Sequence, residues 1–363
     1  MWSPVVPSRP QQVTTTPSGD HTRTVLVTGA TGVVGSALLP ALAGHRVIAL
    51  VHHRDAPEWV RSVRGDLTQP ALGLCPARYD ELAEQVDVIV HAAAVTDFTA
   101  GAAATSDLNV AGTQQIIQLA RDAGATVHYL STAFVTRTDL TRADVGDAAA
   151  DPTDYLASKR VAELMVREAG VPATIIRPSM VIGHSRTGRI AAFQGLHSLA
   201  SAVLRNALPL LPLDPKAWID MVPSDVLADA IAGLVTAGVD YGELWVTAGA
   251  AALTVDRMVD LLVDVGSLLG LASVRPRLVP PEMVDRLVRP VFINPLPRVV
   301  RRRFDDMVAM TALFAGAEPF PSSLADMPGG RPLTPAGLEA AFAASVVYLA
   351  QTKGYLRSNR VAA

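Results

Sequence analysis

The stretch Thr24-Val25-Leu26-Val27-Thr28-Gly29-Ala30-Thr31-Gly32-Val33-Val34-Gly35 decides the fold class of this 363-residue chain. An apolar, β-branched run leads into three glycines spaced G-x-x-G-x-x-G, and a helical pattern over residues 36–42 follows. A helix that begins after such a turn offers free backbone N–H groups and the positive end of its dipole. Glycine lets the backbone approach a bound group closely. The stretch therefore predicts a site for the pyrophosphate of a dinucleotide.

Outward from this stretch, apolar strands alternate with helical patterns along the first two-thirds of the chain. The predicted strands are residues 24–28, 45–51, 86–91, 126–130, 173–176 and 243–247, and the predicted helices are residues 36–42, 107–122 and 154–168. Nearly continuous apolar strands that alternate with helices indicate a parallel sheet covered on both faces. We therefore expect an α/β fold with a Rossmann-like, doubly wound parallel sheet.

The composition excludes several other classes of protein. Cys75 is the only cysteine, which rules out a disulfide scaffold, and the eight histidines are scattered, so no metal site is predicted. A formal net charge of −3 argues against a general nucleic-acid binder. No uncharged apolar run reaches the ~18 residues of a membrane span. We expect a cytoplasmic protein in which lysine is rare, since only Lys159, Lys216 and Lys353 occur.

The end of the second predicted strand indicates which dinucleotide is bound. NAD sites usually place an acidic side chain there for the ribose 2′-hydroxyl. This sequence has His52, His53 and Arg54 there, before any acid. A basic cluster suits a 2′-phosphate, so we predict NADPH, with Arg54 as the main contact. Asp66, in a loop farther along, is a candidate partner for the adenine amino group.

Two groups of residues predict proton transfer. Tyr155 and Lys159 are four residues apart on a predicted helix, so their side chains share one face. A phenol has a pKa near 10, and a nearby ammonium favours its ionised form. Ser131 and Thr132 follow the strand 126–130 at its carboxyl end, where parallel sheets bind ligands. We expect one of these two hydroxyls to donate to a substrate carbonyl oxygen beside Tyr155.

With these residues assembled, the chain resembles the extended short-chain dehydrogenase/reductases over roughly residues 23–250. The motifs are Thr28 to Gly35, Gly65-Asp66-Leu67, His91-Ala92-Ala93-Ala94, Asn109-Val110-Ala111-Gly112-Thr113, Tyr155 to Lys159 and Arg177-Pro178-Ser179. Within that group it looks like the thioester-reductase and fatty acyl-CoA reductase, or male sterility, branch. The motifs for the branch are Gly65-Asp66-Leu67-Thr68, Leu72-Gly73-Leu74, Ser131-Thr132-Ala133-Phe134-Val135, Gly183-His184-Ser185-Arg186-Thr187-Gly188 and Asp220-Met221-Val222-Pro223-Ser224-Asp225-Val226.

The resemblance implies a role for each site residue. Thr132 takes the hydroxyl role with Ser131 beside it, Tyr155 is the acid and Lys159 is its partner. Asn109 is expected to be a buried structural amide. NADPH is the implied cofactor. The expected cofactor-binding residues are Thr28, Gly29, Thr31, Gly32, Val33, Val34, Gly35, His53, Arg54, Asp66, Leu67, Ala92, Ala93, Ala94, Lys159, Pro178 and Ser179.

The expected domain organisation follows from the same patterns. We expect a disordered arm over residues 1–22, which has no apolar core typical of a signal peptide, and a tail over residues 351–363. Residues 23–183 and 218–250 are expected to form the NADP-binding domain. Residues 184–217 and 251–350 are expected to form a smaller, mainly helical substrate lobe, with helices over residues 255–269 and 335–349.

The implied activity is reduction of an acyl thioester to an aldehyde or alcohol. No adenylation or carrier domain is recognisable, so we expect coenzyme A or another protein to supply the thioester. The alternative is a carbonyl reductase or epimerase acting on a ketone, a sterol or a nucleotide sugar, whose diphosphate Arg186, Arg189 and Arg205 would bind. The apolar residues of 184–215 favour an acyl or sterol-like substrate. A non-catalytic NADP-binding sensor is a third possibility, against which the Tyr155–Lys159 pair argues.

The segment from Arg275 to Arg303 is proline-broken and holds eight arginines. Three interpretations remain open. The segment is a solvated flank, or it docks an acidic carrier protein or the phosphates of coenzyme A. In the third interpretation it lies on an anionic membrane with Leu287, Val288, Val291 and Phe292 buried in lipid.

Overall fold

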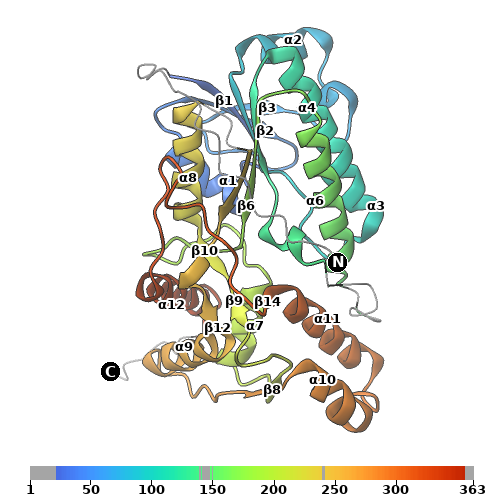
Figure 1. Ribbon diagram of the computed structural model, residues 1–363, viewed down its shortest axis with the longest axis vertical. Helices are drawn as coiled ribbons and strands as arrows, with labels where there is room; N and C mark the ends of the chain where they lie inside the picture. The colour runs from blue at the N-terminus through green and yellow to red at the C-terminus, as the bar shows by residue number, and fades with distance from the viewer. Residues whose placement is uncertain (1–21, 139, 141–147, 149, 239–241, 356–363) are drawn as a thin grey trace, which may run out of the picture.

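A parallel sheet forms the centre of the computed structural model, which describes residues 22–138, 140, 148, 150–238 and 242–355. The strand order is β11-β6-β5-β4-β1-β2-β3, with every pair parallel (Figure 1). The strands are β1 (Thr24–Thr28), β2 (Arg46–Val51), β3 (Arg61–Arg64), β4 (Val88–His91), β5 (Thr126–Leu130), β6 (Ala173–Pro178) and β11 (Gly242–Val246). The expected α/β class and doubly wound parallel sheet are confirmed. The predicted N-terminal arm and most of the predicted tail lie outside the described residues.

Helices cover both faces of the sheet (Figure 1). One face packs against α1 (Val33–Ala41) and α8 (Ser224–Ala237), and the other against α2 (Pro76–Gln85), α4 (Gly112–Ala123) and α6 (Pro152–Arg167). Strand side chains alternate between faces. Val25 and Val27 therefore pack toward α1 and α8, while Leu26 packs with the opposite cluster.

The helix before β5 is longer than its pattern predicts. The pattern indicates residues 107–122, but α3 (Gly101–Ser106), the π-helical turn η2 (Asp107–Ala111) and α4 run on from one another. Asn109 in the π turn is 1 % exposed. Its side-chain oxygen accepts from the backbone N–H of Val95 at 2.8 Å, and its nitrogen donates to Ser158 Oγ at 3.0 Å. The prediction of a buried structural amide is confirmed.

The remaining elements gather below the sheet in the view of Figure 1. The elements below the sheet are the short turns η3 (Ala133–Thr136) and η4 (Gly249–Ala251), the strands β7 (Met180–Ile182), β8 (Leu210–Leu211), β9 (Trp218–Ile219), β10 (Met221–Pro223), β12 (Leu253–Thr254), β13 (Arg277–Leu278) and β14 (Ala315–Gly316), and the helices α7 (Gly195–Leu204), α9 (Val255–Leu268), α10 (Pro281–Met283), η5 (Val284–Ile293), α11 (Arg298–Phe314) and α12 (Pro335–Thr352). The turn η1 (Pro70–Gly73) instead contacts α2 and α4 beside the sheet. The third apolar cluster joins α7, α9 and α12.

The prolines predicted to break the stretch 275–303 lie at the starts of its helices and inside one of them. Pro281 begins α10, where its missing N–H costs nothing, and Pro297 is the N-cap of α11. Pro290 lies inside η5, whose π-helical geometry accommodates it. The prolines therefore separate the continuous helix of α10 and η5 from α11. We call residues 281–302 the arm. Among the side chains described there, only Val284 and Ile293 are buried.

Candidate functional site

The glycine-rich turn lies between β1 and α1, as its sequence predicts. Gly29 has a φ of +66°, and a Cβ there would lie 2.7 Å from the backbone nitrogen of Ala93. A Cβ on Gly35 would overlap the carbonyl oxygen of Gly29. Both positions thus require glycine, because the turn presses against its own backbone and against the loop after β4.

The first turn of α1 is open to an anion. Its N-cap is Gly32, which offers no side chain to cap the helix, and the first turn carries no acidic residue. The free N–H groups and the positive helix end are therefore available to a phosphate. These observations fit the diphosphate of a dinucleotide, next to which Thr31, Val33 and Val34 are the predicted contact residues.

The predicted 2′-phosphate residues lie exposed after β2. His53 and Arg54 are both exposed, and the ring of His53 stacks on His52 with centroids 3.7 Å apart. Arg64, which pairs in register with Val51, donates to the His52 carbonyl and forms an ion pair with Asp55. The first acid after the strand is therefore already neutralised. Sequence reasoning missed Arg64, because its position beside β2 depends on the pairing of β3.

Asp66 follows β3 in a tight turn. Its carboxylate accepts from Thr68 N at 2.9 Å and Thr68 Oγ1 at 2.7 Å, and the His52 Nε2 atom is 3.8 Å away. These contacts, led by the backbone hydrogen bond, hold the pKa of Asp66 below its usual value. Asp66 is thus an ionised acceptor at the same sheet edge as Arg54, which is the state that an adenine amino group requires.

Lys159 is buried between α6 and β5. Its ammonium donates to the Leu130 carbonyl at 2.7 Å and to the Tyr129 hydroxyl at 3.3 Å, and only 3 % of the residue is exposed. Burial lowers its pKa to about 7, against the opposing effect of the Glu163 charge. Lys159 therefore titrates near neutral pH instead of carrying a permanent charge.

Tyr155 lies one helical turn before Lys159, with its ring 5.4 Å from that of Phe98. Burial raises the pKa of its phenol above 10, and a hydrogen bond with the Thr132 hydroxyl opposes this rise. Thr132 is the N-cap of η3 and is 6 % exposed. The structure therefore brings together the phenol and one of the two predicted hydroxyls.

Ser131 has a different neighbour. Its backbone N–H donates to Ile176, and its hydroxyl helps to lower the pKa of Glu163. Burial works to raise that pKa, but the two hydrogen bonds from Arg177 and the charges of Arg177 and Arg167 outweigh it. Successive residues of an extended backbone point to opposite sides. The structure thus separates Ser131 from the Tyr155–Thr132 pair.

The residue that sequence reasoning missed most clearly is Tyr129. It is 1 % exposed, its hydroxyl contacts Lys159, and Thr113 is its second hydrogen-bond partner. The ring centroid lies 4.8 Å from the Lys159 ammonium. A signal was present in the alternation of β5, because Tyr129 lies two residues after Val127 and shares its face. The hydroxyl and the ring of Tyr129 therefore both help to hold the Lys159 ammonium in position.

A buried polar chain continues from Tyr129 to the glycine-rich turn. Thr28 Oγ1 is 2.7 Å from His91 Nδ1, and His91 Nε2 is 3.2 Å from Thr113 Oγ1. Thr113 donates to the Asn109 carbonyl, so it accepts from His91, while Thr28 accepts from Ala93 N and donates to His91. Burial lowers the pKa of His91 to about 3, with the Lys159 charge adding to the effect. The imidazole is therefore neutral and its tautomer is set by both neighbours.

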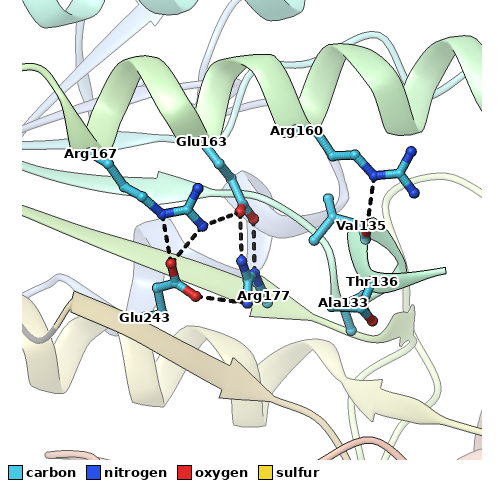
Figure 2. A network of polar contacts seen from close by, with 8 residues as sticks. All are labelled: Ala133, Val135, Thr136, Arg160, Glu163, Arg167, Arg177 and Glu243. Atoms are coloured by element: carbon cyan, nitrogen blue, oxygen red, sulfur yellow. Dashed lines mark hydrogen bonds and ion pairs between the residues drawn. The ribbon is translucent and has the colours of Figure 1, made fainter. Parts of the chain in front are cut away.

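An ion-pair network holds α6 against the sheet (Figure 2). Arg177 on β6 binds Glu163 through two hydrogen bonds of 2.9 and 2.6 Å and reaches Glu243 on β11 at 2.8 Å. Arg167 bridges the same two carboxylates. Arg160 donates to the Val135 carbonyl at 2.8 Å, which ties η3 to α6. The network therefore fixes the helix that carries Tyr155 and Lys159 relative to Thr132.

Two further predicted motifs meet at the loop after β7. Asp225 accepts from Ser185 N at 2.7 Å and Ser185 Oγ at 2.6 Å, so α8 holds the Gly183–Gly188 loop. Asp220 is 3 % exposed, and burial raises its pKa to about 6 against hydrogen bonds from the backbone N–H groups of Ala248 and Gly249. Pro178 pairs in register with Val246. Pro178 and Ser179 thus lie where β6 and β11 end, next to the strand that leads to Thr132.

An apolar cavity of about 490 Å³ opens between α7 and α11. It is lined by Met180, Gly195, Leu196, Ser198, Leu199, Ala202, Leu208, Leu213, Ile219, Asp306, Met307, Met310, Thr311 and Phe314. Phe314 packs edge-on against Phe134 at 5.4 Å, and Phe134 follows Thr132 by two residues. The contact between Phe314 and Phe134 therefore connects the cavity lining to the segment that carries Thr132. Arg186, Arg189 and Arg205 do not line it.

The arm carries three exposed arginines and several exposed apolar residues of the stretch 275–303 at its surface. Leu287, Val291 and Phe292 are 59, 63 and 66 % exposed, while Val288 is half-buried. Arg286, Arg298 and Arg302 are exposed, whereas Arg289 pairs with Asp285 and Asp305, and Arg275 with Asp256 and Asp260. The arm thus combines an apolar surface with exposed positive charge.

The described residues contain neither a metal-binding cluster nor a membrane-spanning helix. Within the part of the chain that the structure describes, no group of three or more His, Cys, Asp or Glu side chains could hold a metal ion. Within the same residues, every helix is too short or too polar to cross a membrane.

Comparison with known proteins gives one family. Residues 45–231 match the model of an NAD-binding family described as male sterility protein. Glycine betaine reductase ATRR of Emericella nidulans is 33 % identical over 250 residues, which cover 58 % of this chain and 19 % of that protein. Hybrid PKS-NRPS synthetase poxE of Penicillium oxalicum is 32 % identical over 229 residues, which cover 58 % of this chain and 6 % of that protein. The chain thus spans about a fifth or less of the length of these curated relatives.

The fold also matches solved structures. The terminal R domain from the myxalamid PKS-NRPS biosynthetic pathway aligns with a TM-score of 0.65 and 24 % identity, covering 93 % of this chain and 92 % of that one. The likeness extends beyond the sheet to the helices below it, since nearly the whole of each chain is covered.

Proposed function

The chain belongs to the NAD-binding family of male sterility proteins, and on that basis we propose that it reduces acyl thioesters with NADPH. A nicotinamide dinucleotide is the cofactor of the family. The observation that carries the proposal is the pair of hydroxyls from Thr132 and Tyr155 at the carboxyl end of β5, beside an apolar cavity. The regions matched in longer relatives that are named reductase or synthetase support the same activity.

NADPH is proposed over NADH because of the charges after β2. Arg54 and Arg64 would hold the 2′-phosphate, with His53 beside them, and Asp66 would meet the adenine. The turn from Gly29 to Val34 would hold the diphosphate. The pairing of Asp55 with Arg64 supports this choice, because the first carboxylate after the strand is then not free to accept from a 2′-hydroxyl.

The proposed reaction uses three side chains of this protein. NADPH supplies the hydride when bound. Tyr155 and Thr132 each donate a hydrogen bond to the thioester oxygen and stabilise the negative charge that develops there. Since burial keeps the Tyr155 phenol protonated, it holds the proton that the oxygen takes up. Lys159, fixed by Leu130 and Tyr129, places positive charge beside the phenolate that remains. The hydroxyl proton then returns to the Tyr155 phenolate as the carbon–sulfur bond breaks, which releases the aldehyde and a thiolate that takes a proton from solvent.

The cavity favours an acyl chain over the polar alternatives. A nucleotide sugar needs cations for its diphosphate, yet no lysine or arginine lines the cavity. We propose that residues 23–183 and 218–250 hold the cofactor and that residues 184–217 and 251–350 hold the substrate. In support, all the lining residues except Met180 and Ile219 come from the second set.

The direct test is an NADPH-oxidation screen of the purified protein. The panel contains acyl-CoAs, acyl groups on a carrier protein, ketosteroids and sugar nucleotides. Oxidation with a thioester, and loss of that turnover in Tyr155→Phe with NADPH binding retained, supports the proposal. Activity confined to ketosteroids or sugar nucleotides, or Tyr155→Phe without any effect, contradicts it.

A further inference from the structure

Thr113 is a buried threonine at the start of α4, where only 1 % of the residue is exposed. Its hydroxyl donates to the Asn109 carbonyl, one helical turn earlier, at 2.7 Å. A threonine hydroxyl carries a single proton and two lone pairs. Because that proton is committed to Asn109, Thr113 can only accept hydrogen bonds from its other neighbours.

Both of those neighbours have a proton to donate. His91 Nε2 lies 3.2 Å from Thr113 Oγ1, and the Tyr129 hydroxyl is the second neighbour. Thr113 accepts from His91 through one lone pair, which leaves the other lone pair for Tyr129. A phenol also has a single proton. Tyr129 therefore donates its proton to Thr113 and turns a lone pair toward Lys159 Nζ, 3.3 Å away.

The direction of this chain favours the charged form of Lys159. An ammonium donates hydrogen bonds and accepts none, so the lone pairs of Tyr129 and of the Leu130 carbonyl suit it. A neutral amine has a lone pair that needs a donor, and the proton of Tyr129 is already in use. The chain thus supports the charge against burial, which lowers the pKa of Lys159 to about 7.

We propose that Thr113 is a positioning residue of the reductase, which orients the Tyr129 hydroxyl as an acceptor for the Lys159 ammonium. The inference rests on the proposed function for its consequence, because the Lys159 charge there serves the phenolate of Tyr155. The hydrogen-bond chain itself does not depend on that function. Removal of the Thr113 hydroxyl would free the Tyr129 proton, which would then be donated to a neutral Lys159 amine and stabilise the uncharged form.

The groups around Lys159 leave it as the one that titrates near neutral pH within this cluster. The titratable or charged groups there are Glu163 and Tyr155 on α6, Tyr129 on β5, His91 on β4 and, paired with Glu163, Arg177 on β6. Burial lowers the pKa of His91 to about 3, and the pKa of Glu163 lies below its usual value. Burial raises the pKa of both phenols above their usual value. A titration of the cluster between about pH 5.5 and pH 9 therefore reports on Lys159.

The scarcity of lysine permits a direct measurement of that titration. Because lysine occurs at three positions, protein labelled with carbon-13 lysine gives three Cε signals in an NMR spectrum, and Lys159→Met identifies that of Lys159. The pH midpoint of this signal is measured for the parent protein, Thr113→Val and Thr113→Ser. Thr105→Val is the matched control, because Thr105 is 3 % exposed and its hydroxyl likewise donates to the carbonyl four residues earlier, that of Gly101, at 2.6 Å.

The expected result is a midpoint about one pH unit lower in Thr113→Val, a ten-fold change in ionisation that matches the scale of one hydrogen bond. Thr113→Ser retains the hydroxyl and should keep the parent midpoint, as should Thr105→Val. In a Tyr129→Phe background, Thr113→Val should have no further effect, because no phenol proton is left to release. With a thioester substrate, the falling limb of the kcat–pH profile should move by the same amount in Thr113→Val, and KM should not change.

The NMR titration and the turnover measurement fail separately. A lowered midpoint in Thr113→Val without any thioester reduction by the parent protein supports the hydrogen-bond chain and contradicts the proposed function. Thioester reduction with the parent midpoint in Thr113→Val contradicts the positioning role and leaves the proposed function standing. An equal shift in Thr105→Val, or a further shift in the Tyr129→Phe background, also overturns the positioning role. Thr113→Ala, which removes the same hydroxyl, takes the place of Thr113→Val if that variant does not fold.

Discussion

At the scale of single residues, the two neighbouring hydroxyls after β5 have different roles. Thr132 lies against Tyr155, whereas Ser131 faces Glu163. Thr132→Ala should lower kcat by about 10²-fold and Tyr155→Phe by about 10²- to 10⁴-fold, because each removes a donor to the developing oxyanion. Ser131→Ala should change kcat far less. Steady-state turnover with the preferred thioester checks this, with fluorescence titration of NADPH as the binding control. Equal losses for Ser131→Ala and Thr132→Ala would contradict the assignment.

The lowered pKa of Lys159 predicts that this side chain takes up a proton when the cofactor binds. Its pKa is about 7 in the cofactor-free structure, since burial outweighs the attraction of Glu163. The negative phosphates of NADPH should raise that pKa. At pH 8 the free protein is then mostly neutral at Lys159 and the complex is charged, so binding should take up part of a proton. At pH 5.5, below the lowered pKa, no uptake is expected from this group.

Calorimetry of NADPH binding in two buffers of different ionisation enthalpy measures this uptake. Lys159→Met should remove the pH 8 uptake. Tyr129→Phe, which deletes one hydrogen bond to the ammonium but keeps the ring, should shift the pH at which uptake begins. Proton release at pH 8, or uptake that persists in Lys159→Met, would exclude this account.

The two arginines at the edge of β2 predict the cofactor preference. Arg54→Ala and Arg64→Ala should each raise the KM for NADPH roughly ten-fold, the scale of one charged hydrogen bond. Arg54→Ala should leave the KM for NADH, which carries no 2′-phosphate, unchanged, whereas Arg64→Ala also frees Asp55 and should lower that KM. The ratio of kcat/KM for the two cofactors is the measurement, and equal effects on both would sink the assignment.

At the scale of elements, the stability of α6 depends on a buried ion-pair network. Glu163 is 3 % exposed at its side chain and holds Arg177 through two hydrogen bonds (Figure 2). Glu163→Gln removes the negative charge that balances the buried Arg177 guanidinium. The substitution should therefore lower the free energy of unfolding by about 3 kcal/mol. The exposed pair of Glu339 with Arg257 is the matched control, and Glu339→Gln should cost under about 1 kcal/mol. Urea unfolding measures both.

The same network predicts an acid-dependent loss of stability. The pKa of Glu163 lies below its usual value, because the hydrogen bonds and charge of Arg177 outweigh the effect of burial. Its contribution is therefore complete above the unfolded-state pKa of about 4.3 and is lost as pH falls through the lower folded-state pKa. Glu163→Gln should flatten the fall in stability over this acidic window. An unchanged slope would contradict the role of this carboxylate.

At the scale of the whole molecule, the arm places exposed charge at one end of the helix that lines the cavity. Arg298 and Arg302 lie in the N-terminal part of α11, while Met307 and Met310 further along it line the cavity. We propose that an acidic carrier protein docks on the arm and presents its thioester to the cavity. The charge of the exposed arginines is the basis for this choice of partner.

Reversal of that charge tests the docking. The double change Arg298→Glu and Arg302→Glu should lower kcat/KM for a carrier-bound acyl group about ten-fold, and the parent protein should lose a similar factor between low and high salt. Acyl-CoA turnover should stay unchanged. Loss of acyl-CoA turnover to the same degree would assign the arginines to coenzyme A phosphates. Binding of the parent protein to anionic vesicles, abolished in the variant, would assign the arm to a lipid surface; either result excludes carrier docking.

The sequence by itself determined the features that depend on neighbours along the chain. The glycine spacing after β1 predicted the phosphate turn, because the need for glycine at Gly29 and the open helix start arise within a few residues. The strand pattern predicted the parallel sheet, and the four-residue spacing placed Tyr155 and Lys159 on one helix face. The prediction of Asn109 as a buried amide came instead from the family resemblance.

Only the tertiary structure decided the features that join distant segments. The family resemblance assigns the hydroxyl role to Thr132, but the contact of Thr132 with Tyr155 depends on how α6 packs against the end of β5. Tyr129 and Arg64 entered the site through strand pairing and burial, which their own neighbours in sequence do not reveal. The cavity joins residues near 200 to residues near 310, and the short-range patterns of either segment carry no information about the other. Local periodicity determines which face a side chain occupies, but the packing of whole elements determines what that face meets.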